Sequence, residues 1–184
     1  MSRFFLALDI GTQDRVRIKN WCLNTLAKQK IIKNFKAIPK NNYHITLAFL
    51  GSLTKQQYNF LVAQSSLISQ QFIVPITNNS SDRVLTLDQL AWFKKPKVLY
   101  LTTCLPPRWL TTLAQHLTST TIKLAIPMDD TPYIPHVSLY RKANQLVSEP
   151  SNINIRIHIK SFSLYLSKPS DDGVVYSAVK TWQI

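Results

Sequence analysis

Two short motifs in the sequence carry side chains that could catalyse proton transfer. His44-Ile45-Thr46 and His136-Val137-Ser138 each place a histidine two positions before a hydroxyl residue, within an apolar run. In a β-strand, residues i and i+2 point to the same face, so each imidazole would project beside its hydroxyl. One such triplet can occur by chance, but these two lie half the 184-residue chain apart. We therefore expect a duplicated lobe with one catalytic histidine in each half.

The reaction that suits two histidines is displacement at phosphorus. Imidazole titrates near neutral pH, so a neutral ring can act as general base while a protonated one acts as general acid. Phosphoryl displacement needs the attacking and leaving oxygens roughly in line across phosphorus. His44 and His136, facing each other across a cleft, would meet that need without a metal. The hydroxyls of Thr46 and Ser138 would then bind nonbridging oxygens, with nearby positive charge countering the phosphate.

The charge of the chain favours a polyanionic partner. The sequence has 22 Lys and Arg against 9 Asp and Glu, a net charge of +13 and a pI near 9.9. Such a field attracts phosphates and speeds their encounter. The alternative is a solubilising surface with no target. An acidic membrane surface has less support, because the basic residues are dispersed rather than gathered beside a lipid-seeking helix, and no apolar span of 18 residues occurs.

Length and cysteine content set further limits. A chain of 184 residues can form one domain or two small, closely packed lobes. Cys22 and Cys104 both lie in apolar contexts, which predicts reduced, buried core residues of a cytoplasmic protein. The sequence contains no Cys-x-x-Cys pair, His-Glu-x-x-His helix or carboxylate cluster, so we expect neither a metal nor another cofactor.

The first motif follows a strand and a helix. Residues 3 to 10 are apolar enough for a central strand buried on both faces, and Thr12 is placed to cap the helix that comes next. Gly51 ends the strand of the first motif. Thr54 and Gln57 then form a capping-box pattern, which predicts a second helix.

The second motif follows the same order of elements. A strand is predicted over residues 97 to 101, after another at 83 to 87, with residues 92 to 96 between the two. Pro106-Pro107 begins a helix, and a proline-rich segment from residue 127 leads to the strand of the second motif. The order strand, helix, His-strand is thus repeated over the two halves. A loop is expected from Pro75 to Asp82.

The last part of the chain predicts two strands, over residues 153 to 166 and 174 to 182, joined by a turn at Asp171-Asp172-Gly173. The first of these alternates isoleucine with polar residues. Asn154, Arg156, His158 and Lys160 therefore share one face. That row is either the wall of an anion cleft or ordinary solvated surface.

The two motifs resemble a known family. Residues 44 to 51 and 135 to 141 are similar to the two His-x-Thr/Ser motifs of the two-histidine phosphoesterase superfamily, above all its bacterial RNA 2',3'-cyclic phosphodiesterases, also called 2'-5' RNA ligases. Residues 3 to 8 and 96 to 101 are similar to other landmarks of the family. The resemblance implies one domain over residues 1 to 184, with a bilobal, pseudo-twofold α+β fold. Each lobe would hold an antiparallel sheet with helices on its outer face, and the active cleft would lie between the lobes.

The resemblance also implies roles for individual residues. His44 would protonate the O3' leaving group and His136 would activate water, while Thr46 and Ser138 map onto the phosphate-binding hydroxyls. Arg141 matches the arginine that often follows the second motif. By strand alternation, however, Arg141 would lie on the face opposite His136.

Two departures from the family pattern concern the second motif. Ser138 replaces the commoner threonine but keeps the hydroxyl donor. Tyr140 stands where a small or aliphatic residue is frequent, and by alternation it would share the face of His136, where it would either narrow the cleft or stack on a base. The candidates for base stacking are Phe49, Trp92, Tyr133 and Tyr140, and for each of these packing is the alternative.

The sequence therefore predicts an enzyme that hydrolyses RNA 2',3'-cyclic phosphate ends to 2'-phosphates. The partner would be RNA with such ends, with tRNA fragments one candidate, and the enzyme would act as a monomer away from membranes. The alternatives within the enzyme class are 2'-5' RNA joining and action on a small cyclic nucleotide or a 2'-5' oligoadenylate. The alternative from another class is a basic RNA-binding protein that has lost catalysis.

Overall fold

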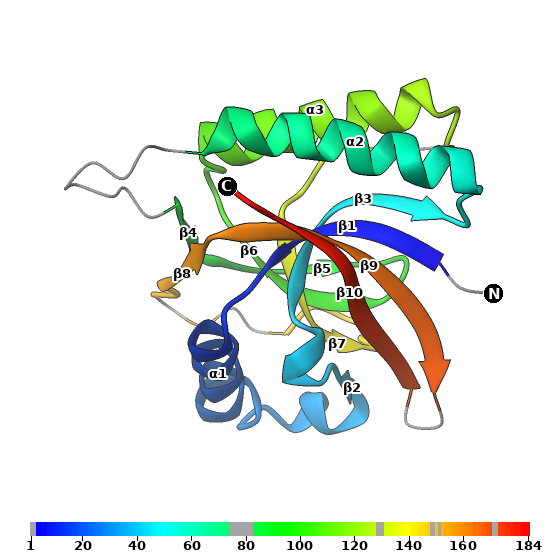
Figure 1. Ribbon diagram of the computed structural model, residues 1–184. Coiled ribbons are helices and arrows are strands. Elements are labelled where there is room, and N and C mark those ends of the chain that lie inside the picture. The colour runs from blue at the N-terminus through cyan, green and yellow to red at the C-terminus, as the bar shows by residue number, and fades with distance from the viewer. Residues whose placement is uncertain (1–2, 74–82, 128–130, 148–149, 151, 171–172) are drawn as a thin grey trace.

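The computed structural model describes residues 3–73, 83–127, 131–147, 150, 152–170 and 173–184. Over these residues the protein has an α+β fold with mostly antiparallel strands and three α-helices, α1 (Thr12–Trp21), α2 (Lys55–Phe72) and α3 (Arg108–Lys123) (Figure 1). The predicted loop from Pro75 to Asp82, and Asp171 and Asp172 of the predicted turn, lie outside the described residues.

Most strands belong to one sheet. Their order in it is β10 (Gly173–Gln183), β9 (Ser161–Ser170), β1 (Arg3–Asp9), β3 (His44–Gly51), β7 (His136–Arg141), β6 (Val98–Thr102) and β5 (Gln89–Phe93), with β2 (Lys36–Ala37) also paired to β7. The strands β4 (Arg83–Leu87) and β8 (Ile155–Ile159) pair separately.

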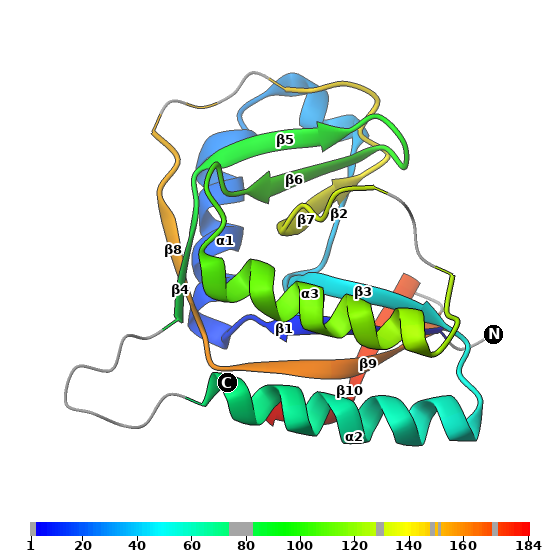
Figure 2. The same cartoon turned by 90° about the horizontal axis from the view of Figure 1, so that it is seen from above.

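The two motif strands lie side by side at the centre of this sheet. β3 and β7 are joined by a single residue pair, Ile45 with Val137. Figure 2 shows the consequence: β1, β3, β9 and β10 form one group of strands and β5, β6 and β7 another. The sequence predicted a separate sheet for each lobe, whereas the structure connects both groups through this one point. The narrow junction lets the two strands diverge, which leaves room for a cleft between the groups.

The helices pack against strands from the other half of the chain. α3 comes from the second half but contacts β3 of the first, and α2 contacts both α3 and β10. In Figures 1 and 2 these two helices run together along one side of the molecule, and α1 lies away from them, against β8. The halves of the chain are thus interleaved, a feature that the repeat in the sequence did not predict.

Local signals explain where two of these helices begin. Thr54 and Gln57 form the predicted capping box, with the Gln57 N–H donating to Thr54 Oγ1 at 3.2 Å and the Thr54 N–H donating to Gln57 Oε1 at 3.0 Å. Pro107 precedes α3 as predicted. Thr12, in contrast, is the first residue of α1 and Gly11 is its N-cap, so the predicted cap was wrong.

Two strand predictions needed correction. Residues 92 to 96 were expected to be a connection, but Trp92 and Phe93 end the strand β5, which pairs with β6. The run from 153 to 166 was expected to be one strand, but it is divided at Lys160 into β8 and β9, which pair with β4 and β1 respectively. The isoleucines of β8 are buried and its polar residues are exposed, as alternation predicted.

The core confirms one cysteine prediction and overturns the other. Cys22 is buried among the apolar side chains of α1, β3 and the neighbouring strands, and burial raises the pKa of its thiol to about 12. Cys104 is exposed instead, because it lies past the end of β6, where its backbone N–H donates to Asp88 Oδ1 at 2.7 Å.

Candidate active site

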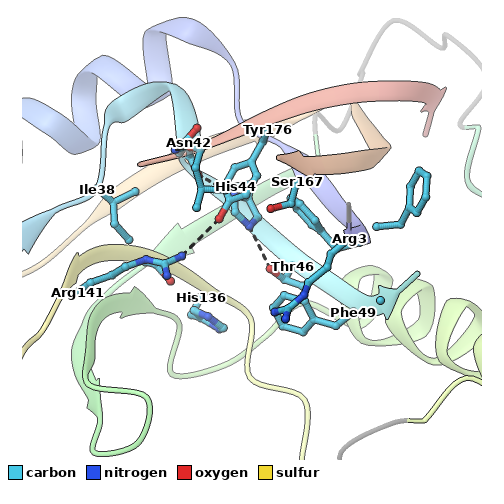
Figure 3. Close-up of a pocket in the computed structure, with 15 residues that line it drawn as sticks. Arg3, Ile38, Asn42, His44, Thr46, Phe49, His136, Arg141, Ser167 and Tyr176 are labelled. Carbon is cyan, nitrogen blue, oxygen red and sulfur yellow. Dashed lines mark hydrogen bonds between the residues drawn. The ribbon is translucent and has the colours of Figure 1, made fainter. Parts of the chain in front are cut away.

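A cleft of about 540 Å³ opens where the two groups of strands meet. β3 contributes three of its side chains and β7 another three, while β1, β9 and β10, together with Ile38 and Asn42, supply the rest of the wall (Figure 3). The two sets are His44, Thr46 and Phe49 from β3, and His136, Ser138 and Arg141 from β7. The structure therefore brings together the two motifs that the sequence singled out.

Both histidines are held in the same way. His44 Nδ1 lies 2.7 Å from the carbonyl oxygen of Asn42, and His136 Nδ1 lies 2.7 Å from that of Ile134. A carbonyl can only accept, so each Nδ1 carries the proton, and each neutral ring presents the lone pair of Nε2. In both cases the carbonyl belongs to the residue two positions before the histidine. This shared arrangement leaves Nε2 of each ring as the atom able to exchange protons.

The two Nε2 atoms differ in their partners. His44 Nε2 lies 3.1 Å from Thr46 Oγ1, and because Nδ1 already holds the ring proton, the Thr46 hydroxyl donates to Nε2. Protonating His44 reverses this bond and frees the hydroxyl to donate elsewhere. Among the described residues, His136 Nε2 has no hydrogen-bond partner, and its ring packs edge-on against Phe93 at 5.0 Å. A lone pair without a partner suits a general base.

Burial shifts both histidines toward the neutral form. It lowers the pKa of His44 to about 4, aided by repulsion from the Arg15 and Arg141 guanidinium groups and from His136 when that ring is protonated, while the bond to Asn42 opposes the shift. Burial likewise lowers the pKa of His136, against the opposing bond to Ile134. The cleft by itself therefore keeps both His44 and His136 neutral at neutral pH. A bound phosphate anion would favour the protonated form of one of them.

The depressed pKa of His44 makes the stability of the fold depend on pH. Between the unfolded value of 6.5 and the folded value of about 4, the unfolded chain binds more protons. Stability from this group is thus fully present above pH 6.5 and is lost as the pH falls toward 4, by up to about 3 kcal/mol. We expect His44→Gln to flatten the curve of unfolding free energy against pH over this interval, measured by urea titration. If the curves of the wild-type protein and of His44→Gln ran parallel, the lowered pKa of His44 would be contradicted.

A β-bulge decides the orientation of Arg141. In the pairing of β7 with β6, Ser138 faces Tyr100 and Tyr140 faces Leu99, so Leu139 is an extra residue without a partner. An extra residue reverses the alternation beyond it. Arg141 therefore turns into the cleft beside His136 and Ser138, although strict alternation predicted the opposite face.

The same bulge removes Tyr140 from the site. Its side chain is 5% exposed, does not line the cleft and packs edge-on against Phe35, with ring centroids 6.5 Å apart. Burial raises the pKa of its hydroxyl to about 12. The prediction that Tyr140 faces the cleft, to narrow it or to stack on a base, was wrong. Trp92 and Tyr133 do not line the cleft either, and the Trp92 Nε1–H donates to the carbonyl of Ala143 at 2.8 Å.

An equivalent bulge in β3 brings Phe49 into the cleft. Thr46 faces Ala7 of β1 and Ala48 faces Leu6, so Leu47 is the extra residue. Phe49 is 67% exposed and lines the cleft, as the stacking hypothesis requires, although alternation from His44 placed it on the other face. In both strands the cleft is thus lined by the histidine and by the residues two and five positions after it. The extra residue of the bulge comes three positions after the histidine in each strand.

Sequence reasoning missed several residues of the cleft wall. Arg3, Ser167 and Tyr176 form a row across three strands, because Ser167 pairs with Arg3 of β1 and with Tyr176 of β10. Their proximity depends on the pairing of distant strands, for which the sequence carries no local signal. The polar row predicted around β8 lies elsewhere: Asn154, just before the strand, lines a separate hollow of about 380 Å³ with Arg156, His158 and Arg17.

The structure also bears on metal binding and on membrane insertion. Within the part of the chain that the structure describes, no group of three or more His, Cys, Asp and Glu side chains is placed to hold a metal ion. Over the same residues, no helix is both long and apolar enough to cross a membrane.

Comparison with known proteins identifies relatives over the whole length. No protein-family model matches the chain. The RNA 2',3'-cyclic phosphodiesterase of Escherichia coli K12 is 26% identical over 183 residues, which cover 99% of this chain and 96% of the relative. The crystal structure of E. coli LigT complexed with 3'-AMP superposes with a TM-score of 0.82 at 28% identity, over 100% of this chain and 98% of that one. A crystal structure of a phosphoesterase superposes with a TM-score of 0.81 at 26% identity, over 100% of this chain and 99% of that one.

Proposed function

The chain is a full-length homologue of E. coli LigT in the two-histidine phosphoesterase family, and we propose that it hydrolyses RNA 2',3'-cyclic phosphate ends to 2'-phosphates. The observation that carries the proposal is the matched geometry of the two histidines, each fixed through Nδ1 with Nε2 left for proton transfer. Crystals of E. coli LigT with phosphate and with 3'-AMP lend support, because both ligands carry the group that this cleft would hold.

The proposed step needs one acid and one base. His136 Nε2 takes a proton from water, the water oxygen forms a bond to phosphorus, and the bond from phosphorus to O3' breaks. His44, which the bound phosphate anion keeps protonated at Nε2, gives that proton to O3'. The assignment is supported by the environment of each ring, because His136 Nε2 has no partner among the described residues while His44 Nε2 is already hydrogen-bonded to Thr46.

The remaining residues of the cleft would bind the phosphate and the base. Once His44 is protonated, the Thr46 hydroxyl is free to donate to a nonbridging oxygen, and Ser138 and Arg141 would hold the others. Phe49, with its exposed ring at the edge of the cleft, would stack on the terminal base. No metal or other cofactor takes part in this scheme.

The proposal extends to the organisation of the chain. Residues 1 to 184 would act as one two-lobed domain, with a pseudo-twofold relation between the β3 and β7 sites. The shared positions of the histidine, the hydroxyl, the bulge and the third site residue support that relation. Action as a monomer in the cytoplasm, on RNA such as tRNA fragments, stays a prediction.

Turnover of a small substrate tests the function and separates it from its alternatives. The purified protein, in EDTA, should open a 2',3'-cyclic mononucleotide and a short oligonucleotide with a cyclic end. Hydrolysis of the mononucleotide would exclude a basic RNA-binding protein without catalysis. Adding an oligonucleotide with a free 5'-hydroxyl would reveal 2'-5' joining as a longer product. Absence of any turnover, with RNA binding intact, would overturn the proposal.

Neighbouring substitutions on β7 test the orientation that the bulge gives to Arg141. Arg141→Gln should raise KM by about 10-fold or more, because a charge-assisted bond to phosphate is worth ~1.5–3 kcal/mol. Tyr140→Phe is the matched control and should leave both kcat and KM unchanged, since its buried side chain lies outside the cleft. Steady-state kinetics on a cyclic mononucleotide decide the matter. A raised KM in Tyr140→Phe together with an unchanged KM in Arg141→Gln would indicate strict alternation along β7.

A further inference from the structure

Tyr176 is the residue of the C-terminal hairpin that contacts parts of both motifs. It belongs to β10, and its pairing with Ser167 of β9 places its half-buried side chain in the wall of the cleft. In Figure 3 its ring stands against His44 while its hydroxyl points to Arg141. The chemistry proposed above uses His44 and Arg141 but assigns nothing to this tyrosine.

The ring of Tyr176 restrains the imidazole of His44. The two rings meet edge to face, with centroids 5.2 Å apart and an interplanar angle of 87°. Tyr176 also packs edge-on against Phe5 at 5.0 Å, and Phe5 in turn contacts His44 at 5.0 Å, so the three rings contact one another in a triangle. The imidazole thus contacts two aromatic side chains in addition to its bond to Asn42. This contact keeps water from one side of the ring and limits its rotation.

The hydroxyl of Tyr176 holds Arg141 when no substrate is bound. Arg141 Nη2 donates to it over 3.4 Å, a long bond between exposed groups. A bond of this length is weak, and a phosphate oxygen is a stronger acceptor because it is charged. The guanidinium has further N–H groups that a phosphate can bind while the hydroxyl still holds Nη2, and the side chain is already oriented toward the cleft when substrate arrives.

We propose that Tyr176 is a positioning residue that orients both motifs from the C-terminal hairpin: its hydroxyl directs Arg141 toward the phosphate, and its ring fixes the imidazole plane of His44. The inference rests on the proposed function for its kinetic consequences. The restraint on His44 and the preorganisation of Arg141 can also be observed without turnover.

Two substitutions separate the hydroxyl from the ring. Tyr176→Phe keeps the ring, so KM for a 2',3'-cyclic mononucleotide should rise by about three- to tenfold with kcat nearly unchanged. In the Arg141→Gln background the same substitution should add nothing, because the hydroxyl acts through Arg141. An unchanged KM in Tyr176→Phe would refute the role of the hydroxyl. An equal effect in both backgrounds would show that the hydroxyl contacts the substrate itself.

Tyr176→Leu removes the ring and should lower kcat by about tenfold, since misplacing a reacting group is costly. It should also raise the pKa of His44, followed by NMR titration, while Tyr176→Phe leaves that pKa at its wild-type value. The charged groups that act on His44, namely His136, Arg15 and Arg141, are the same in all three proteins. The Asp9 carboxylate beside the start of β3 is also unchanged and stays bonded to Ser161, Ser163 and Tyr165.

A matched control and an independent readout complete the test. Tyr58→Phe changes a tyrosine on α2 that contacts Phe4 and lies outside the cleft, and it should leave every quantity unchanged. If the wild-type protein fails to turn over cyclic phosphates, the proposed function fails, yet the NMR titration of His44 and the affinity for inorganic phosphate still report on Tyr176. If the pKa of His44 and the affinity for inorganic phosphate both keep their wild-type values in Tyr176→Leu and in Tyr176→Phe, the inference itself is overturned.

Discussion

Replacing His44 or His136 with alanine should lower the rate of cyclic phosphate hydrolysis by about 10²–10⁴-fold, the usual contribution of a general acid or base. The double substitution should be little worse than either single one, because groups that act as a unit are not additive. Steady-state kinetics on a cyclic mononucleotide would measure the loss. The protein should stay folded, since both histidines lie at the cleft and outside the apolar core.

An exposed histidine provides the matched control. His116 lies on α3, outside the cleft, and contacts the ring of Phe72. Its replacement by alanine should leave the rate unchanged. If either motif variant kept more than about a tenth of the wild-type rate, its histidine would not be the acid or the base, given the size of such contributions.

Phe5→Ala should have the largest effect on stability among the residues near the site. Phe5 is 3% exposed and contacts His44, Tyr165 and Tyr176 through ring centroids 5.0 to 5.2 Å apart. Removing a buried phenyl group leaves a cavity and typically costs about 3–5 kcal/mol. Because the same ring supports His44, kcat should fall as well, even under conditions in which the variant is folded.

The control for this substitution is Phe60→Ala on α2. Phe60 is 38% exposed, so its loss should change the unfolding free energy by less than about 1 kcal/mol, as is usual for surface positions. Urea titrations of both variants give the comparison. Equal losses would mean that the cluster around Phe5 does not support the cleft.

The sequence contained enough information to pair the two motifs, because alternation within a strand places His44 beside Thr46 and His136 beside Ser138. Further along the two motif strands, the prediction from alternation failed for one physical reason. A bulge at Leu47 and another at Leu139 each add one residue, and each reverses which side chains face the cleft. Phe49 and Arg141 thereby enter the cleft and Tyr140 leaves it. No local pattern in either strand marks these bulges.

The remaining failures come from contacts between distant segments. The row of Arg3, Ser167 and Tyr176 depends on how β9 pairs with both of its neighbours. The packing of α3 on β3 likewise joins the two halves of the chain, although the repeat suggested that each half folds on itself. Local signals predicted where α2 and α3 begin, through the Thr54 and Gln57 capping box and through Pro107, since those signals act within a few residues.

The identity of the product end is the measurement that tests the central claim most directly. If His44 donates its proton to O3' while His136 activates water, the phosphate must remain on O2'. An oligonucleotide with a 2',3'-cyclic phosphate, incubated in EDTA and analysed by phosphorus NMR, should therefore yield a 2'-phosphate. A dominant 3'-phosphate would reverse the placement of His44 and His136 relative to the two ribose oxygens, and an intact cyclic end would contradict the proposed hydrolysis altogether.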